Sequence, residues 1–268
     1  MDLSDKKNEI AGTQSIGRAT EILRTIAASD GAGFGLGEVV ERTGIEKPTV
    51  HRILRRLVTE AMLTQNPATR NYHLGPLLYE LGLAATPPVP AQQLCREAIR
   101  ELSGLTGDSA FLMLRSGQDV VCLDRSEGHF PIKVLNLGVG QRRPMGCGAG
   151  SIALLSVLPD DQVEKILVKN AQELRARGEP SPEEFYKIIT QARKEGYAVK
   201  DAPDLPVRTL SVPIRDVYGH GVCALSVTSL TMRVEQNHAK MVDTLRRVAE
   251  ELSWKIRGSV TLKKDTHG

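Results

Sequence analysis

A run of basic side chains between residues 47 and 56 is the first group in the sequence with obvious chemistry. It comprises Lys47, Arg52, Arg55 and Arg56 with no acidic residue among them, and Thr49 and His51 add hydrogen-bonding groups. Guanidinium groups suit nucleic acid because they pair with phosphate oxygens and can hold guanine through two parallel hydrogen bonds. A solvated, positively charged helix face would show the same pattern, so the surrounding elements must decide.

Small residues between positions 144 and 151 form a second candidate site, Pro144-Met145-Gly146-Cys147-Gly148-Ala149-Gly150-Ser151. The segment lacks the third glycine of a dinucleotide fingerprint and a Walker lysine, and no His or carboxylate is placed to make Ser151 a nucleophile. It predicts a tight loop leading into a helix that starts near Ser151. The free N–H groups of a helix start attract a carboxylate. Close packing of that helix against a sheet is the alternative.

Histidine and cysteine spacing predicts neither a metal site nor a redox motif. His73, His129, His220 and His238 each lack a second His or Cys at ligand spacing. The cysteines, Cys95, Cys122, Cys147 and Cys223, lie far apart and form no Cys-x-x-Cys pair. We interpret them as reduced packing residues, and we expect no catalytic group, no cofactor and no metal.

Composition excludes several classes of protein. The chain has 268 residues, 41% hydrophobic and 25% charged, which excludes a largely disordered protein and leaves room for two domains. The net charge of +3 does not by itself imply nucleic acid. Residues 1–12 are polar and no run of about 18 apolar residues occurs, so neither a secretory signal nor a membrane span is expected. We expect a cytoplasmic protein with flexible ends at 1–12 and 261–268.

The elements around the basic run predict a DNA-binding domain over residues 13–75. Helices are expected at 15–28, 36–43 and 47–60, followed by a hairpin of two extended runs at 62–65 and 71–74. Gly44 can stop the second helix, and Pro48 fits the first turn of the third. This order is typical of a winged helix-turn-helix, whose third helix enters the major groove. The residues expected on DNA are Lys47, Pro48, Thr49, His51, Arg52, Arg55 and Arg56, with Arg70 on the wing.

The proline-rich stretch at 86–90 marks a boundary, beyond which an α+β domain is expected over residues 91–260. Strands are expected at 110–114, 120–123, 132–135, 210–214 and 222–228, and helices at 160–177, 182–195 and 232–257. These elements predict a mixed sheet flanked by helices.

Several segments together resemble the IclR family of bacterial transcriptional regulators, over about residues 13–253. They are Ser15-Ile16-Gly17-Arg18-Ala19, Thr43-Gly44-Ile45, Pro48-Thr49-Val50-His51-Arg52-Ile53-Leu54, Tyr72-His73-Leu74-Gly75, Arg143-Pro144-Met145, Glu195-Gly196-Tyr197-Ala198, Ser211-Val212-Pro213-Ile214 and Ala224-Leu225-Ser226-Val227. The resemblance implies a winged helix, a linker helix at 77–85 within a linker at 76–90, and an effector domain that begins with a helix at 91–106 and has a GAF-like antiparallel sheet. It also implies homodimers, often paired into tetramers, on a palindromic promoter site in double-stranded DNA.

The resemblance implies effector contacts from Met145, Ala149, Asp201, Thr209, Ser226 and Thr228, and the loop of small residues adds Gly148 and Ser151. The expected effector is a small organic or aromatic acid, most simply a carboxylate. The sequence departs from the family pattern where Gly146 replaces a histidine and Ser151-Ile152 replace Gly-Lys. These changes alter the size and polarity expected of the pocket.

The sequence therefore predicts a ligand-responsive transcriptional regulator of catabolic genes that is not an enzyme. Two alternatives stay open. An enzyme acting on a small acid or ester, with an accessory winged helix, would need a convergent acid–base or nucleophile group. A protein-interaction module would use the winged helix on a protein partner.

Overall fold

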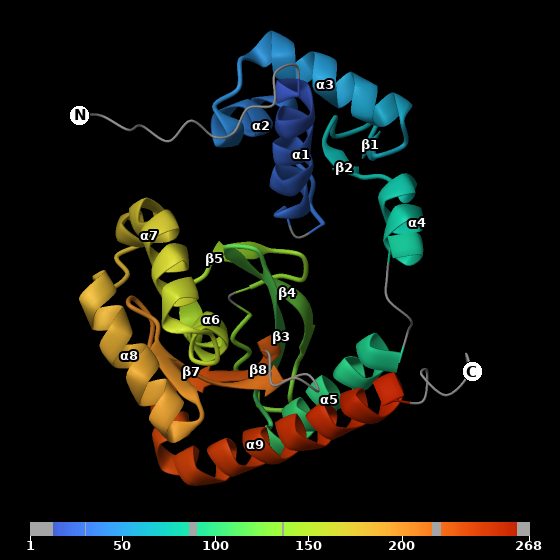
Figure 1. Cartoon of the computed structure of the whole chain (residues 1–268). Coiled ribbons are helices and arrows are strands. Elements are labelled where there is room, and N and C mark those ends of the chain that lie inside the picture. Colours follow the sequence, from blue (N-terminus) through green and yellow to red (C-terminus); the bar gives the residue numbers. More distant parts are fainter. Residues whose placement is uncertain (1–12, 30, 86–89, 136, 216–220, 262–268) are drawn as a thin grey trace, which may run out of the picture. The chain divides into compact units, whose positions relative to one another are not determined.

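The computed structural model describes residues 13–29, 31–85, 90–135, 137–215 and 221–261 (Figure 1). The chain divides into two compact units at residues 87 and 88, within the proline-rich stretch. Of the ends expected to be flexible, 1–12 and 261–268, only Thr261 is among the described residues, where it ends a helix. Within the described part of the chain, no helix has the length and apolar character needed to cross a membrane.

The N-terminal unit contains the three helices and the hairpin expected from the sequence, and then the expected linker helix. Its elements are α1 (Gln14–Ala27), α2 (Leu36–Thr43), α3 (Lys47–Thr59), β1 (Leu63–Gln65), β2 (Tyr72–Leu74) and α4 (Pro76–Ala85). Strands β1 and β2 are antiparallel. Apolar residues at helical spacing on α1 to α3 meet in one core with the hairpin: Ile22, Ile26, Val39, Val50, Leu54, Leu57, Leu63 and Tyr72.

The C-terminal unit is an α+β domain, as predicted. Its elements are α5 (Pro90–Thr106), β3 (Ser109–Ser116), β4 (Asp119–Ser126), β5 (Arg142–Pro144), α6 (Gly148–Leu155), α7 (Asp160–Ala176), α8 (Pro182–Glu195), β6 (Ala198–Asp201), β7 (Val207–Arg215), β8 (Gly221–Leu230) and α9 (Thr231–Thr261).

The strands of this unit form one sheet in the order β5-β4-β3-β8-β7-β6. Every described strand pair is antiparallel, so the mixed sheet expected from the element pattern is wrong, whereas the antiparallel sheet implied by the family resemblance is present. Side chains alternate between two cores because successive residues of a strand point to opposite faces. Leu225 and Val227 of β8 pack with α5 and α9, and Ala224 packs with α6, α7 and α8. The sheet is therefore the middle of three layers (Figure 1).

Four details differ from the sequence prediction. Residues 132–135 are irregular rather than a strand, and Ile132 is 54% exposed, so its apolar character does not mark a core position. The short strands β5 and β6 were missed, because an Arg-Arg-Pro segment and a four-residue strand carry little β signal. Helix α6 begins at Gly148 instead of near Ser151. Helix α9 extends beyond the predicted end at 257 and is distorted at Asn237.

Candidate functional site

The orientation of α3 is fixed by the turn before it and by the core behind it. Gly44 ends α2 with φ of 65°, and its N–H donates to the Val40 carbonyl at 2.9 Å. Such a left-handed cap is accessible to glycine at little cost. Val50, Leu54 and Leu57, at three- and four-residue spacing, are buried. The opposite side of α3 is therefore held toward solvent.

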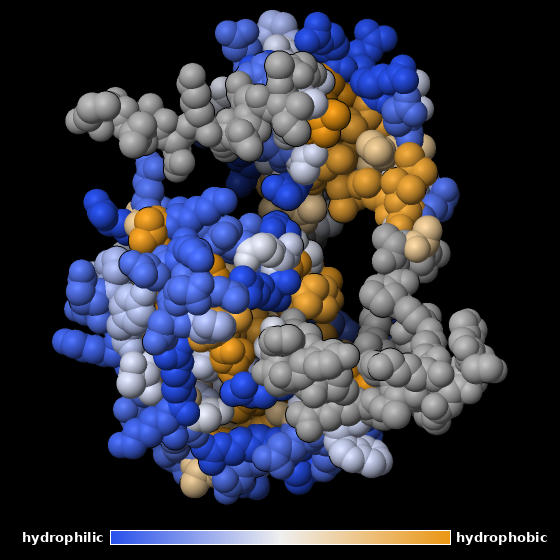
Figure 2. All heavy atoms as spheres, viewed as in Figure 1, coloured by the Kyte–Doolittle hydropathy of each residue, from blue (hydrophilic) through white to orange (hydrophobic). Residues whose placement is uncertain are grey.

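The residues predicted to bind DNA share that outward side. Lys47, Pro48, His51, Arg52, Arg55 and Arg56 are exposed, and Thr49 is half-buried. Arg56 forms an ion pair with Glu60 one turn later. The guanidinium groups of Arg52 and Arg55 have no hydrogen-bond or ion-pair partner among the described residues and therefore remain available. The surface of this unit is hydrophilic over α3 (Figure 2).

Arg70 lies at the tip of the hairpin in a strained backbone conformation. Its φ is 63°, a region that costs a non-glycine residue about 1–2 kcal/mol. Hydrogen bonds hold it there: its N–H donates to the Asn66 carbonyl at 2.9 Å, and Gln65 Nε2 donates to the Arg70 carbonyl at 2.9 Å. The side chain is exposed. The hairpin thus presents a cation at a fixed position.

A cavity of about 50 Å³ in the C-terminal unit brings together most of the predicted effector residues. Of those residues, Gly148, Ala149, Ser151, Thr209, Ser226 and Thr228 line it. Its other walls come from residues that sequence reasoning did not select, Phe111, Met113, Leu137, Arg143, Cys147 and Gly150. The cavity lies between the start of α6 and the strands β3, β7 and β8.

Two glycines allow α6 to start so close to the sheet. A Cβ at Gly150 would lie 2.8 Å from Met113 Cγ, and Gly146 has φ of 113°. The Ser151 hydroxyl stabilises this loop, because it accepts a hydrogen bond from the Gly146 N–H at 3.1 Å and lies 2.8 Å from the Cys147 carbonyl. The hydroxyl of Ser151 is therefore already hydrogen-bonded to backbone groups of the loop.

Hydroxyl groups cover the sheet side of the cavity. The register of β7 and β8 places Thr209 opposite Thr228 and Ser211 opposite Ser226. The two threonine hydroxyls are 2.9 Å apart, and the Ser226 hydroxyl donates to Ser211 Oγ at 2.9 Å. Hydroxyls both donate and accept hydrogen bonds, so this wall can bind oxygen atoms of a small polar molecule.

The cavity has a positive electrostatic bias. Arg143 is the only permanently charged residue among the described residues that line it. Burial raises the pKa of the Cys147 thiol to about 11, so this wall residue is neutral at physiological pH. Gly148, Ala149 and Gly150 form the first turn of α6, which has no side-chain cap within the described residues. Both features favour an anion.

Met145 and Asp201 lie outside the described lining of this cavity. Met145 is fully buried in the core, and its carbonyl accepts a hydrogen bond from Asn170 Nδ2 at 3.2 Å. Asp201 lies on β6 and accepts hydrogen bonds from Arg208 at 2.6 and 2.8 Å. These hydrogen bonds lower the pKa of the Asp201 carboxyl. The structure therefore groups six of the eight predicted residues.

A larger groove of about 550 Å³ between α8 and α9 contains none of the predicted site residues. Trp254 and Arg193 are among its lining residues, and Trp254 is 75% exposed. The guanidinium of Arg193 already binds Asp160 at 2.6 Å and two backbone carbonyls. Among the described residues, no three His, Cys, Asp or Glu side chains gather as a metal site requires.

Comparison with known families supplies the identification. Residues 15–67 match the IclR helix-turn-helix domain, and residues 89–254 match the C-terminal domain of bacterial IclR transcriptional regulators. The chain belongs to the IclR family. It is therefore a transcriptional regulator with a DNA-binding domain and a ligand-binding C-terminal domain, and the enzyme alternative is set aside.

Curated relatives match most of the chain. The HTH-type transcriptional regulator BhcR of Paracoccus denitrificans is 27% identical over 91% of this chain and 87% of its own. The HTH-type transcriptional regulator KdgR of Escherichia coli is 26% identical over 82% of this chain and 84% of its own. Both proteins are named as transcriptional regulators.

Solved IclR structures share the fold. The IclR regulator from Alicyclobacillus acidocaldarius superimposes with a TM-score of 0.73 at 23% identity, over 90% of this chain and 98% of that one. An IclR homologue from Microbacterium hydrocarbonoxydans in complex with 4-hydroxybenzoate gives a TM-score of 0.71 at 19% identity, over 91% and 99%. At these identities the likeness establishes the architecture only.

Proposed function

We propose that this regulator docks α3 in the major groove of a palindromic operator and responds to a small carboxylate bound between α6 and the sheet. The observation that carries the DNA part is the position of Arg52 and Arg55. Both side chains are exposed on the side of α3 opposite its packed face, and their guanidinium groups have no partner among the described residues. Arginine can there reach base edges or phosphates.

A homodimer is part of the proposal, because a palindrome needs two copies of the reading helix. Apolar side chains on the surface of the N-terminal unit support it. Leu74 is 46% exposed, Tyr79 is 71% exposed and Leu81 is 48% exposed. The surface over α4 is correspondingly hydrophobic in Figure 2. A hydrophobic surface area of this kind is typical of protein interfaces.

Cytoplasmic location and control of catabolic genes complete the proposal. The cytoplasmic location is supported because a regulator of bacterial promoters works where the chromosome is. The control of catabolic genes rests on the family resemblance, and the functions of the genes that flank this regulator's own gene test it. Pairing of dimers into tetramers remains a prediction from the family.

Replacing Arg70 with glycine is expected to stabilise the N-terminal unit and weaken operator binding at the same time. Glycine adopts the left-handed conformation of residue 70 without strain, so the free energy of unfolding should rise by about 1 kcal/mol. The lost cation should lower affinity several-fold and reduce the salt dependence of binding by about one phosphate contact. Urea unfolding and fluorescence anisotropy measure the two effects, with a duplex that the wild type selects from a random library.

Ala61→Gly is the matched control for this substitution. Ala61 also has a positive φ, of 54°, but carries no charge to offer DNA. The control should gain stability and keep wild-type affinity. Unchanged operator affinity in Arg70→Gly would remove the hairpin arginine from the interface, and selected duplexes without inverted half-sites would contradict the palindrome.

The effector part of the proposal rests on the cavity beside α6. Its lining combines the cation of Arg143, the hydroxyls of Thr209, Thr228 and Ser226, and apolar walls such as Phe111. A volume of about 50 Å³ is small next to the ~150 Å³ cavity that holds benzene in another protein. The observed volume therefore favours a small aliphatic acid over an aromatic one.

Substituting Arg143 with glutamine is expected to remove most of the stabilisation that a bound acid produces. A hydrogen bond to a charged group contributes about 1.5–3 kcal/mol, so affinity should fall roughly 10- to 100-fold. At a ligand concentration of about 100 times the wild-type dissociation constant, bound ligand should stabilise the wild-type fold by about 2.7 kcal/mol. If the substitution lowers affinity 100-fold, this stabilisation should fall to about 0.4 kcal/mol. Thermal-shift titrations with acetate, lactate and 4-hydroxybenzoate, and with the corresponding amides, measure this.

Arg142→Gln provides the control for the neighbouring position. Its guanidinium binds Asp119 at 2.8 Å and Ser116, and it does not line the cavity. This variant should keep the ligand-induced shift relative to its own ligand-free melting temperature. Equal shifts with an acid and its amide, or a full shift in Arg143→Gln, would contradict the carboxylate assignment.

A further inference from the structure

A partly buried ion pair joins Lys200 to Glu179 in the C-terminal unit. Lys200 is on β6, and Glu179 lies in the connection between α7 and α8. The Lys200 Nζ atom donates to Glu179 Oε2 at 2.6 Å, and the two side chains are only 22% and 14% exposed. Solvent screens such a pair weakly, so a change in either charge acts strongly on its neighbours. Neither residue was selected by sequence reasoning.

The strand register places Lys200 next to the hydroxyl wall of the effector cavity, because Lys200 pairs with Thr209 on β7. Thr209 pairs in turn with Thr228 on β8, and both threonines line the cavity. Directly paired residues of antiparallel strands share a face of the sheet, with Cβ atoms about 4.5–5.5 Å apart. Ala198, two residues before Lys200, packs into the core on this side of the sheet. Lys200 therefore lies one strand beyond Thr209, on the cavity side.

Glu179 lies next to the loop that forms another wall of the cavity. Its N–H donates to the carbonyl of Leu174, near the end of α7, at 3.0 Å. A Cβ at Gly146 would lie 2.9 Å from Leu174 Cδ2, so the Leu174 side chain covers this loop. Cys147, the residue after Gly146, lines the cavity. The ion pair therefore connects the strand beside the hydroxyl wall to the chain that covers the loop.

We propose that Lys200 is a second cation of the effector site and that its ligand is a small dicarboxylic acid. This role rests on the proposed function, in which Arg143 binds the first carboxylate. The second carboxylate replaces Glu179 as the partner of Lys200. Glu179 lies in a connection between two helices rather than within one, so its released side chain can turn toward water.

The exchange favours a diacid over a monoacid. A partly buried ammonium group without an anion beside it is costly, so Lys200 needs one carboxylate in every state of the site. Glu179 supplies that carboxylate in the free protein. A monoacid whose only carboxylate is at Arg143 leaves the ion pair closed, whereas a diacid contributes one carboxylate to each cation. Moving Glu179 aside also lengthens a cavity that has a volume of only about 50 Å³.

Acids matched in chain length test the proposal on the full-length protein by isothermal titration calorimetry. Succinate should bind the wild type several-fold more tightly than butyrate, because displacing Glu179 offsets only part of the new interaction. Lys200→Gln removes the second cation, so succinate should then bind no more tightly than butyrate. Glu179→Gln keeps the shape of the side chain but removes the competing charge, so the affinity for succinate should rise about 10-fold.

Asp161→Asn is the control variant, because it breaks an exposed ion pair with Lys165 on α7. It should keep the preference for succinate. Equal binding of succinate and butyrate by the wild type, or an unchanged preference in Lys200→Gln, would overturn the proposal. Should Lys200→Gln fail to fold, an unchanged succinate affinity in Glu179→Gln would overturn it as well. Acid binding that depends on Arg143 but shows no preference for diacids would leave the proposed function intact, whereas a wild type that binds no acid would contradict both.

Discussion

Substituting Arg52 with alanine is expected to weaken operator binding about 10- to 100-fold, because a good arginine contact to a base contributes about 1–3 kcal/mol of discrimination. Arg52 is exposed on α3 and has no partner among the described residues, so it loses no competing interaction on binding. The fold should be unaffected, since the α3 residues buried in the core are Val50, Leu54 and Leu57. Anisotropy titrations against the selected duplex measure the affinity.

The salt dependence of binding tells which kind of contact is lost. A base contact leaves the slope of affinity against salt unchanged and relaxes sequence preference, whereas a phosphate contact lowers the slope by about one. Arg56→Ala should cost less than Arg52→Ala, because the Arg56 guanidinium already pairs with Glu60. Arg24→Ala, an exposed arginine on α1, is the control for general loss of charge. If Arg52→Ala keeps the affinity, the salt dependence and the sequence preference of the wild type, Arg52 does not belong to the DNA interface.

The recognition helix could be predicted because its signals are local. Proline at 48, the Gly44 stop and the three- to four-residue spacing of Val50, Leu54 and Leu57 all lie within about four helical turns. The same holds for α7, α8 and the hairpin strands. Helix periodicity also separates the buried from the exposed side, so the outward arginines follow from the sequence alone.

The walls of the effector cavity could be predicted only in part. Ser226 and Thr228 are two residues apart on β8, so the sequence places them on the same face of the strand. Their pairing with Ser211 and Thr209 on β7 depends on the strand register, which the sequence does not give. Phe111 and Met113 reach the cavity because β3 pairs with β8, a neighbour that is distant in sequence. Arg143 lies on β5, a three-residue strand without an apolar pattern. Such long-range pairing leaves no local signal, so these residues emerged only from the structure.

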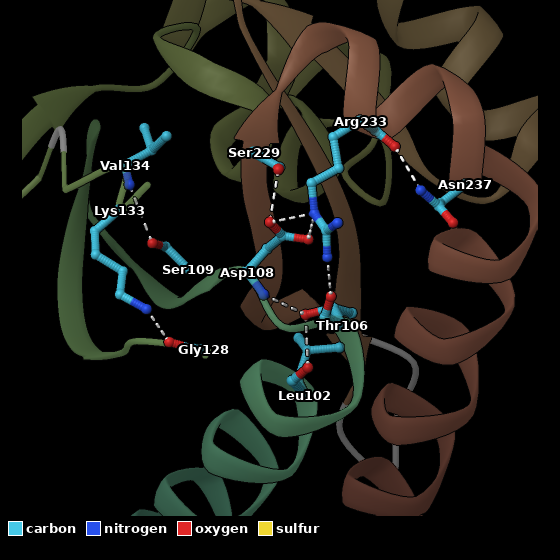
Figure 3. A network of polar contacts seen from close by, with 10 residues as sticks. All are labelled: Leu102, Thr106, Asp108, Ser109, Gly128, Lys133, Val134, Ser229, Arg233 and Asn237. Atoms are coloured by element: carbon cyan, nitrogen blue, oxygen red, sulfur yellow. Dashed lines mark hydrogen bonds and ion pairs between the residues drawn. The ribbon is translucent and has the colours of Figure 1, made fainter. Parts of the chain in front are cut away.

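The other large effect is expected for Asp108→Ala, which should reduce the free energy of unfolding of the C-terminal unit by about 3 kcal/mol. The Asp108 side chain is 1% exposed and accepts hydrogen bonds from Arg233 Nε at 2.9 and 3.0 Å and from the Ser229 hydroxyl at 2.6 Å (Figure 3). Arg233 also donates to the Thr106 carbonyl at 3.0 Å and stacks over the Phe130 ring. The carboxylate thus joins the end of α5, the end of β8 and the start of α9.

Removing Asp108 leaves a largely buried guanidinium and a buried hydroxyl without their acceptor, which is costly. Urea unfolding followed by circular dichroism and by Trp254, the only tryptophan and a residue of α9, measures the loss. Asp161→Ala is the control: its ion pair with Lys165 is exposed, so it should change stability by less than about 0.5 kcal/mol. A double variant, Asp108→Ala with Arg233→Met, should recover part of the loss because no charge is left unpaired. If Asp108→Ala is no more destabilising than Asp161→Ala, the network does not stabilise this junction of three elements.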